Sequence, residues 1–312
     1  MLYPPGFHQH SLVTTLGTIA YYTADQPSQP QVVPPVRVPS LSEAATGDRR
    51  ETLVFLHGFG GGSSAYEWSK VYPAFASEYR ILAPDLLGWG RSDHPARDFC
   101  PDDYLTTIQE FLENTCDRPV RVVASSLVAA LVVRVAIAHP HLFHSLILTC
   151  PSGLSDFGSD YRRSFFAQMV STPVLDRVLY FTALATEPGI RNFLEQRQFA
   201  RANRVFPEIV DAYLASARQP NAEYSALSFV RGDLCFDLAT YIPQLTTPTA
   251  MIWGEKAQFT GVELGRRLAA LNPQAIKGLD VLDDVGLTPQ LELPAVTIGL
   301  IRRFIALLSA AQ

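Results

Sequence analysis

Apolar residues recur along the chain in two alternating patterns, short continuous runs and longer amphipathic stretches. The continuous runs are typical of strands buried on both faces of a parallel sheet, and they read TLVFLHG, RILAPD, VRVVAS, HSLILTC, TPTAMIWG and GLDVLDD. Helical periodicity lies between or after these runs, at about 101–113, after Leu127, at 261–271 and in the closing stretch AVTIGLIRRFIALL. This alternation predicts right-handed β-α-β units in one mainly parallel sheet.

Three segments depart from the alternation. Near the N-terminus, SLVTTLGTIAYYTA contains two β-rich runs around a Leu-Gly turn and predicts an opening hairpin. The proline-rich residues 26–49 predict an extended surface connection, with docking of a protein partner as the alternative. Over 155–245, strand signals give way to helical, aromatic-rich sequence. We therefore predict one α/β core formed by 1–154 and 246–312, with a helical segment inserted at 155–245.

Composition and charge exclude several classes of protein. The 312 residues are 47% hydrophobic and 18% charged, which is typical of a globular protein with a sizeable core. A net charge of −5 without any basic run gives no electrostatic footprint for nucleic acid. The four cysteines are widely spaced, and no His, Cys or carboxylate set has metal-ligand spacing. We expect reduced thiols, no metal and no cofactor.

No segment predicts secretion or membrane insertion. The N-terminus lacks a basic region followed by an apolar stretch, so a secretory signal is not expected. The most apolar run, LVAALVVRVAIA, is too short to span a bilayer and contains Arg134. We expect a cytoplasmic protein without a transmembrane segment.

Two turn motifs follow predicted strand ends, H-G-F at 57–59 and D-L-L-G-W-G-R-S-D at 85–93. Together with the sequence from LVFLHGFGGGSSAYEW to DDVGLTPQLELPAVTIGLI, they resemble the α/β-hydrolase superfamily. The similarity is greatest to its capped branch of epoxide hydrolases, haloalkane dehalogenases, carbon–carbon bond hydrolases and esterases. The resemblance implies a mostly parallel eight-stranded sheet flanked by helices, with a helical cap inserted after strand 6. The segment 155–245 would be that cap.

The resemblance also implies an oxyanion hole. In the superfamily it is formed by two backbone N–H groups, here those of Phe59 and Leu127. Backbone donors survive side-chain replacement, so the loop His57-Gly58-Phe59 is a candidate for holding a polarised oxygen or a carboxylate. The alternative is a structural turn with a hydrogen-bonded histidine, and the two roles are compatible.

The nucleophile turn departs from the superfamily pattern. The motif G-x-S-x-G aligns with Ala124–Val128, so both glycines are replaced while Ser126 keeps the nucleophile position. Small residues are favoured there because the nucleophile lies on a strained strand-to-helix turn. Val128 is bulky, and it therefore either relaxes the turn or fills space that the superfamily leaves for close helix packing.

The two other members of the superfamily's catalytic triad are absent from their aligned positions. The acid that follows W-G-x-x is replaced by Ala257, and the base that precedes L-E-x-P is replaced by Leu287. A serine at its ordinary pKa is a poor nucleophile without an adjacent base. Lys256, Glu255 and Asp156 are alternative catalytic groups, each weighed against an ordinary charge; Cys150 and His94 are expected to be structural.

Two function hypotheses remain open. In the first, a disabled or strongly altered hydrolase binds a small apolar ligand or a protein partner in its capped pocket, with partner docking through the cap or the proline-rich segment. In the second, a noncanonical serine hydrolase cleaves an ester-type bond through Ser126 and an unidentified base. The aromatic side chains of the inserted segment suit an apolar ligand, although most would also form the segment's own core: Tyr161, Phe165, Phe166, Tyr180, Phe181, Phe193, Phe199 and Phe206.

Overall fold

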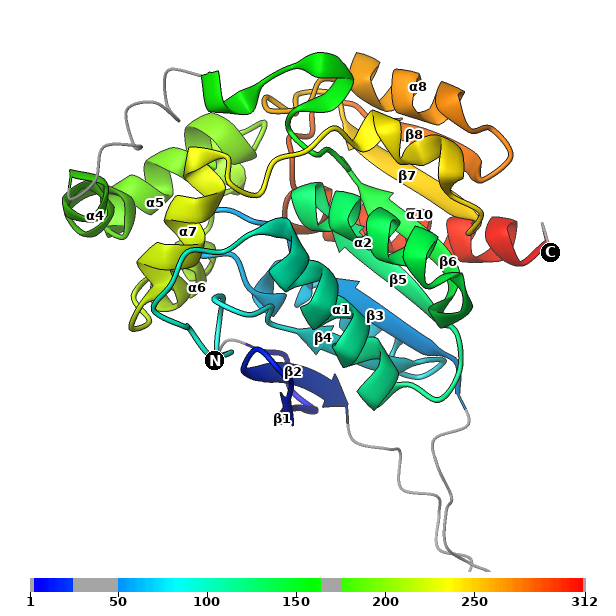
Figure 1. The fold of residues 1–312 in the computed structure, drawn as a ribbon, viewed down its shortest axis with the longest axis horizontal. Helices are drawn as coiled ribbons and strands as arrows, with labels where there is room; N and C mark the ends of the chain where they lie inside the picture. The colour runs from blue at the N-terminus through cyan, green and yellow to red at the C-terminus, as the bar shows by residue number, and fades with distance from the viewer. Residues whose placement is uncertain (1–2, 25–49, 164–174, 311–312) are drawn as a thin grey trace, which may run out of the picture.

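The computed structural model describes residues 3–24, 50–163 and 175–310. The proline-rich segment 26–49, with its expected partner role, and Phe165 and Phe166 lie outside these residues. Eight strands form one sheet in the order β1-β2-β4-β3-β5-β6-β7-β8 (Figure 1). The pairs β1–β2 and β2–β4 are antiparallel and all other neighbours are parallel. The predicted hairpin and the predicted mostly parallel eight-stranded sheet are therefore confirmed.

The six expected apolar runs match β3 to β8, and the two β-rich runs of the expected hairpin match β2 and the end of β1. Alternate side chains of the central strands enter two separate hydrophobic clusters, one on each face of the sheet, which is why these runs are continuously apolar. The strands are β1 (Phe7–Val13), β2 (Thr18–Ala24), β3 (Thr52–Leu56), β4 (Arg80–Pro84), β5 (Val120–Ser125), β6 (Phe143–Thr149), β7 (Thr249–Gly254) and β8 (Ile276–Leu282).

Helices cover both faces of the sheet. One cluster joins the sheet to α1 (Pro101–Thr115), α2 (Ser126–Ala138) and α8 (Val262–Leu271). The other joins it to α10 (Pro294–Ala310) and to two 3-10 turns, Ala65–Trp68 and Tyr72–Phe75. No helix within the described ranges is both long enough and apolar enough to cross a membrane.

Among the described residues between β6 and β7, all regular structure is helical apart from one isolated bridge between Leu154 and Phe236. The helices include α4 (Leu175–Leu179), α5 (Glu187–Phe193), α6 (Pro207–Ala217) and α7 (Ala222–Arg231), which lie together at one end of the sheet (Figure 1). Hydrogen bonds join α6 and α7 to the loop after β4: the Gly90 N–H donates to Oγ of Ser216 at 3.0 Å, and the Ser225 hydroxyl donates to the Gly88 carbonyl. This helical segment therefore lies over loops that follow the strands.

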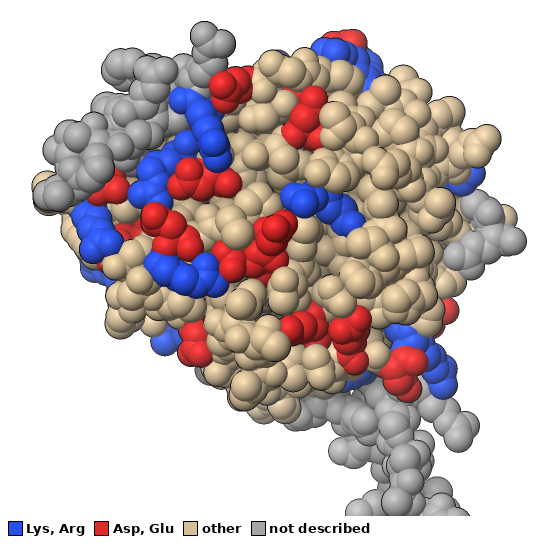
Figure 2. All heavy atoms as spheres, viewed as in Figure 1, with Lys and Arg blue, Asp and Glu red and all other residues tan. Residues whose placement is uncertain are grey.

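Charged side chains on the face shown in Figure 2 are of both signs and lie next to one another, without a continuous basic patch. Arg97 pairs with Asp103, and Arg231 pairs with Asp98 and Asp176. This face offers no stripe of cations along which a phosphate backbone would bind.

Candidate functional site

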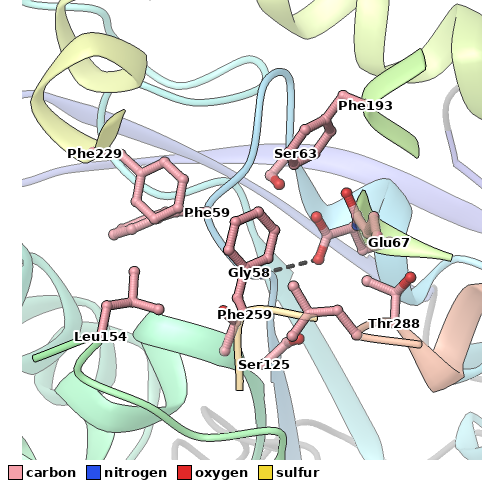
Figure 3. Close-up of a pocket in the computed structure, with 13 residues that line it drawn as sticks. Gly58, Phe59, Ser63, Glu67, Ser125, Leu154, Phe193, Phe229, Phe259 and Thr288 are labelled. Carbon is pink, nitrogen blue, oxygen red and sulfur yellow. Dashed lines mark hydrogen bonds between the residues drawn. The ribbon is translucent and has the colours of Figure 1, made fainter. Parts of the chain in front are cut away.

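A small pocket lies beyond the carboxyl ends of β3 and β5, where open parallel sheets bind ligands. The empty space between its lining atoms, including open solvent at the mouth, is about 400 Å³, and only a small part of it is enclosed. Figure 3 shows Phe59, Phe229 and Leu154 on one side of this space and Glu67 and Thr288 on the other. The pocket therefore has an apolar side and a polar side. Its lining residues are Gly58, Phe59, Ser63, Glu67, Ser125, Ser126, Leu154, Phe193, Gln198, Phe229, Phe259, Leu287 and Thr288.

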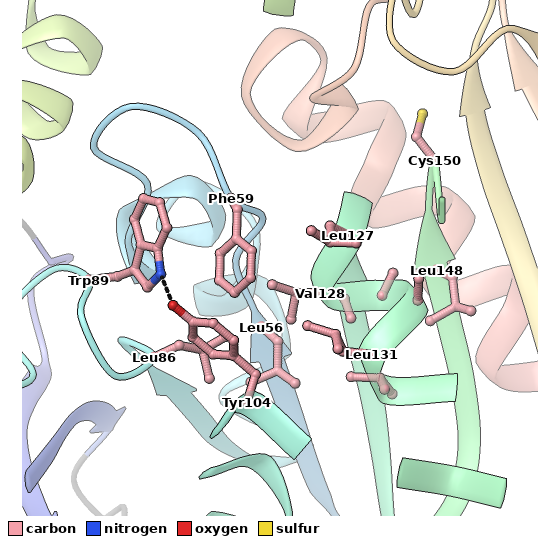
Figure 4. Packing of buried hydrophobic residues seen from close by; sticks show 14 of the residues in the cluster. Leu56, Phe59, Leu86, Trp89, Tyr104, Leu127, Val128, Leu131, Leu148 and Cys150 are labelled. Carbon is pink, nitrogen blue, oxygen red and sulfur yellow. Dashed lines mark hydrogen bonds between the residues drawn. The ribbon is translucent and has the colours of Figure 1, made fainter. Parts of the chain in front are cut away.

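The first residue of α2 keeps the strained turn of a nucleophile elbow. Ser126 directly follows β5 and has a φ of 56°, in the left-handed region that costs a side-chain-bearing residue about 1–2 kcal/mol. Neither Ala124 nor Val128 relaxes this turn. Val128 is fully buried and packs in the core near Phe59 and Leu131 (Figure 4), so it fills space between the helix and its neighbours. Of the two expectations for Val128, space filling is correct.

The predicted oxyanion hole consists of the backbone N–H groups of Phe59 and Leu127. Within the described part of the chain, neither the Phe59 N–H nor the Leu127 N–H donates a hydrogen bond. Leu127 also lies in the first turn of α2, where aligned peptide dipoles favour negative charge. Both donors are therefore unpaired within the described residues, and their role as an oxyanion hole stays a prediction.

His57 is a structural residue of the same loop. Its Nε2 accepts a hydrogen bond from the Leu86 N–H at 3.0 Å, so its Nδ1 carries the proton and donates to the Gly58 carbonyl at 2.7 Å. Burial lowers the pKa of His57 to about 4. Both ring nitrogens are therefore occupied in joining the loop after β3 to the loop after β4, and His57 is not a base for Ser126.

The positions expected for the triad's base and acid hold apolar side chains. Leu287 lines the pocket together with Ser126, and its backbone N–H donates to the Gln198 carbonyl at 2.8 Å. Ala257 is buried outside the pocket lining. Among the described residues, no histidine, lysine or carboxylate forms a hydrogen bond with the Ser126 hydroxyl.

The alternative catalytic groups lie elsewhere. Glu255 and Lys256 form an exposed ion pair at 3.4 Å. Asp156 is buried and accepts hydrogen bonds from the N–H groups of Gly153 and Leu238, so it joins the two ends of the helical segment. Burial raises the pKa of Cys150 to about 12, as expected for a core thiol.

A buried carboxyl that the sequence analysis missed occupies the polar side of the pocket. Glu67 is only 1% exposed; its Oε2 accepts from the Gly58 N–H and its Oε1 accepts from the Tyr213 hydroxyl, both at 2.9 Å. The Gln198 amide in turn donates to Tyr213 at 2.8 Å. Burial raises the pKa of Glu67. The available signal was the acidic residue within AYEW, a turn whose other residues are all apolar or aromatic.

The match to a known family agrees with this geometry. A family model described as alpha/beta hydrolase fold matches residues 51–284. The chain belongs to this family. The expected superfamily membership is therefore confirmed, and the match spans the loop after β3, the elbow and the helical segment.

Related proteins of the α/β-hydrolase fold family include several hydrolases. The uncharacterized hydrolase YugF of Bacillus subtilis is 26% identical over 232 residues, which cover 73% of this chain and 80% of YugF. A 2-hydroxy-6-oxononadienedioate/2-hydroxy-6-oxononatrienedioate hydrolase of Cupriavidus pinatubonensis is 26% identical over 240 residues, or 74% of this chain and 78% of the relative. Among solved structures, the ligand-free epoxide hydrolase CorEH has a TM-score of 0.74 at 18% identity and covers 97% of this chain and 99% of its own, which shows the common fold.

For this α/β-hydrolase fold protein, the structure brings together only part of the expected site. Ser126, Gly58, Phe59 and Leu287 line one pocket, and Leu127 follows Ser126 in the first turn of α2. His57 lies behind the pocket wall in its own hydrogen bonds.

Proposed function

We propose that this protein binds a small, largely apolar ligand over Ser126, beneath the helical segment 155–245 acting as a cap, and that it has lost the acyl-transfer chemistry of its family. The observation that carries the proposal is Leu287 in the pocket wall beside Ser126, where a proton-accepting side chain is required. Without a base, Ser126 remains a neutral hydroxyl and a poor nucleophile.

The remaining pocket chemistry supports binding. The free N–H groups of Phe59 and Leu127 suit a ligand oxygen, and rings and aliphatic side chains supply most of the other contacts. Such a site resembles an enzyme's substrate pocket with the proton transfer removed. A carbonyl or carboxylate group on an apolar body fits it best.

A second candidate function is noncanonical hydrolysis through Ser126. It is favoured by the left-handed backbone of Ser126, because strained residues of this kind concentrate at active sites. A base supplied by a bound ligand or by a partner would be needed, since oxyanion stabilisation alone gives only residual catalysis.

Labelling with a fluorophosphonate probe at neutral pH distinguishes the two functions. We expect no modification of the purified protein by intact mass, beside full labelling of an active serine hydrolase as control. Stoichiometric labelling that maps to Ser126 and disappears in Ser126→Ala would refute the proposal. In the double variant Leu287→His, Ala257→Asp, we expect labelling to appear if the turn still supports chemistry.

A further inference from the structure

Glu67 is a buried acid without a basic partner. It is the only residue of the pocket lining with an acidic or basic side chain, and no Lys, Arg or His in the described ranges forms an ion pair with it. Its neighbours supply neutral donors alone: the Gly58 N–H, the Tyr213 hydroxyl and the side chains of Ser63 and Gln290. Hydrogen bonds therefore compensate its burial, whereas no positive charge does.

Further acceptors without partners surround this carboxyl. Gln198 is 4% exposed and lines the pocket. Its Nε2 donates to Tyr213, but its Oε1 has no hydrogen-bond partner among the described residues. Thr288 is 2% exposed and also lines the pocket with an unpaired hydroxyl. Buried polar atoms in folded proteins are rarely left unpaired, so these atoms indicate a ligand that supplies donors.

Two of the acceptors, Glu67 and Gln198, lie near glycines of the loop after β3. A methyl group placed on Gly58 would lie 3.6 Å from Oε2 of Glu67 and 3.4 Å from Cβ of Ser126. One placed on Gly60 would lie 3.7 Å from Oε1 of Gln198 and 3.4 Å from Cε1 of Phe193. Carboxyl, amide oxygen and aromatic ring are thus neighbours along one short stretch of backbone.

Four phenylalanine rings line the same pocket: Phe59, Phe193, Phe229 and Phe259. The faces of aromatic rings attract cations, and a site that combines several rings with a carboxylate is typical of ammonium recognition. A neutral hydroxyl would satisfy the acceptors but would form no ion pair with Glu67.

We propose that the pocket selects a ligand whose head group is a protonated amine, held by Glu67 and the oxygen of Gln198, with the apolar body against the phenylalanine rings. This inference rests on the proposed ligand-binding function and adds the chemistry of the ligand. The amine would lie on the polar side of the pocket, and a carbonyl oxygen of the same ligand would reach the N–H groups of Phe59 and Leu127.

A matched pair of probes tests the inference. Benzylamine is protonated at pH 7, and benzyl alcohol has nearly the same shape but no charge. We expect ligand-observed NMR titration to give an affinity for benzylamine about tenfold or more above that for benzyl alcohol, which is the size expected of one charge-assisted contact. In Glu67→Gln this advantage should disappear, because an amide carries no charge that attracts the ammonium group. Glu263→Gln removes an exposed carboxylate from α8 and should change neither affinity.

The outcomes separate the two proposals. Equal affinities in the wild type, or an amine advantage that persists in Glu67→Gln, would overturn the amine inference and leave ligand binding intact. Failure of both probes to bind would count against both proposals. If Glu67→Gln does not fold, Gln198→Leu removes a second acceptor with the carboxyl in place, and we expect benzylamine to bind about threefold or more weakly; unchanged affinity would overturn the inference.

Discussion

The left-handed backbone of Ser126 predicts a difference in unfolding free energy between two variants, Ser126→Gly and Ser126→Ala. With a φ of 56°, a side-chain-bearing residue loses about 1–2 kcal/mol relative to glycine, while glycine's greater freedom in the unfolded chain offsets about 0.4–1 kcal/mol. Ser126→Gly should therefore be about 1 kcal/mol more stable than Ser126→Ala. Both variants remove the hydroxyl, so their difference reports the backbone alone. Urea unfolding measures it directly, and the expected difference in Tm is about 2 °C for a chain of this length.

A glycine substitution elsewhere in α2 provides the control. Ala130 is fully buried in the same helix and has no left-handed backbone, so Ala130→Gly should destabilise the protein by about 1 kcal/mol or more. The two substitutions thus have opposite expected signs. If Ser126→Gly proves less stable than Ser126→Ala, the turn is not strained, and the argument that a nucleophile elbow persists without its glycines is wrong.

Two other variants test the surrounding structure. The pKa of His57 falls from 6.5 to about 4 on folding. The stability that neutral His57 contributes is therefore complete above pH 6.5, and about 3 kcal/mol of unfolding free energy is lost as the pH falls toward 4. The acid sensitivity of unfolding should therefore be weaker in His57→Asn than in the wild type when urea unfolding is compared at pH 7 and pH 5; equal slopes would contradict the neutral, buried assignment. Val128→Gly restores the family's glycine but removes a fully buried side chain, so we expect the unfolding free energy to fall by about 3 kcal/mol. An unchanged unfolding free energy would show that Val128 is not a core residue.

Hydrophobic patterning was sufficient to predict the sheet. Strands such as β5 (Val120–Ser125) and β7 (Thr249–Gly254) are buried along their whole length, and continuous apolar runs have that meaning in a parallel sheet. The helices α1 and α8 differ from their predicted bounds by at most two residues. Turn glycines and prolines mark these ends, so local sequence is informative about them.

The pocket was less accessible to sequence reasoning because its lining comes from distant parts of the chain. Glu67 and Gln198 are 131 positions apart by their numbering, and hydrogen bonds join both to Tyr213 on α6. No local pattern predicts such a contact, since burial of a polar residue depends on tertiary neighbours. The positions of Ser126 and Leu287 were found because family motifs fix their spacing, whereas the resemblance assigns no role to Glu67 although it lies within LVFLHGFGGGSSAYEW.

The loop that carries Leu287 keeps its place by contacts that do not involve a catalytic base. Glu292 accepts hydrogen bonds from the Gly286 N–H at 2.6 Å and from the Ala200 N–H at 2.9 Å, and Arg204 pairs with Glu292 at 3.1 Å. The Leu287 N–H is itself held by the Gln198 carbonyl. Because the backbone is fixed on both sides of position 287, loss of a histidine there removes a proton acceptor without moving the pocket wall. A histidine introduced by Leu287→His would occupy the same position in the pocket wall as the leucine. A failure to activate Ser126 would then be attributed to the turn or to the missing acid, and not to a displaced loop.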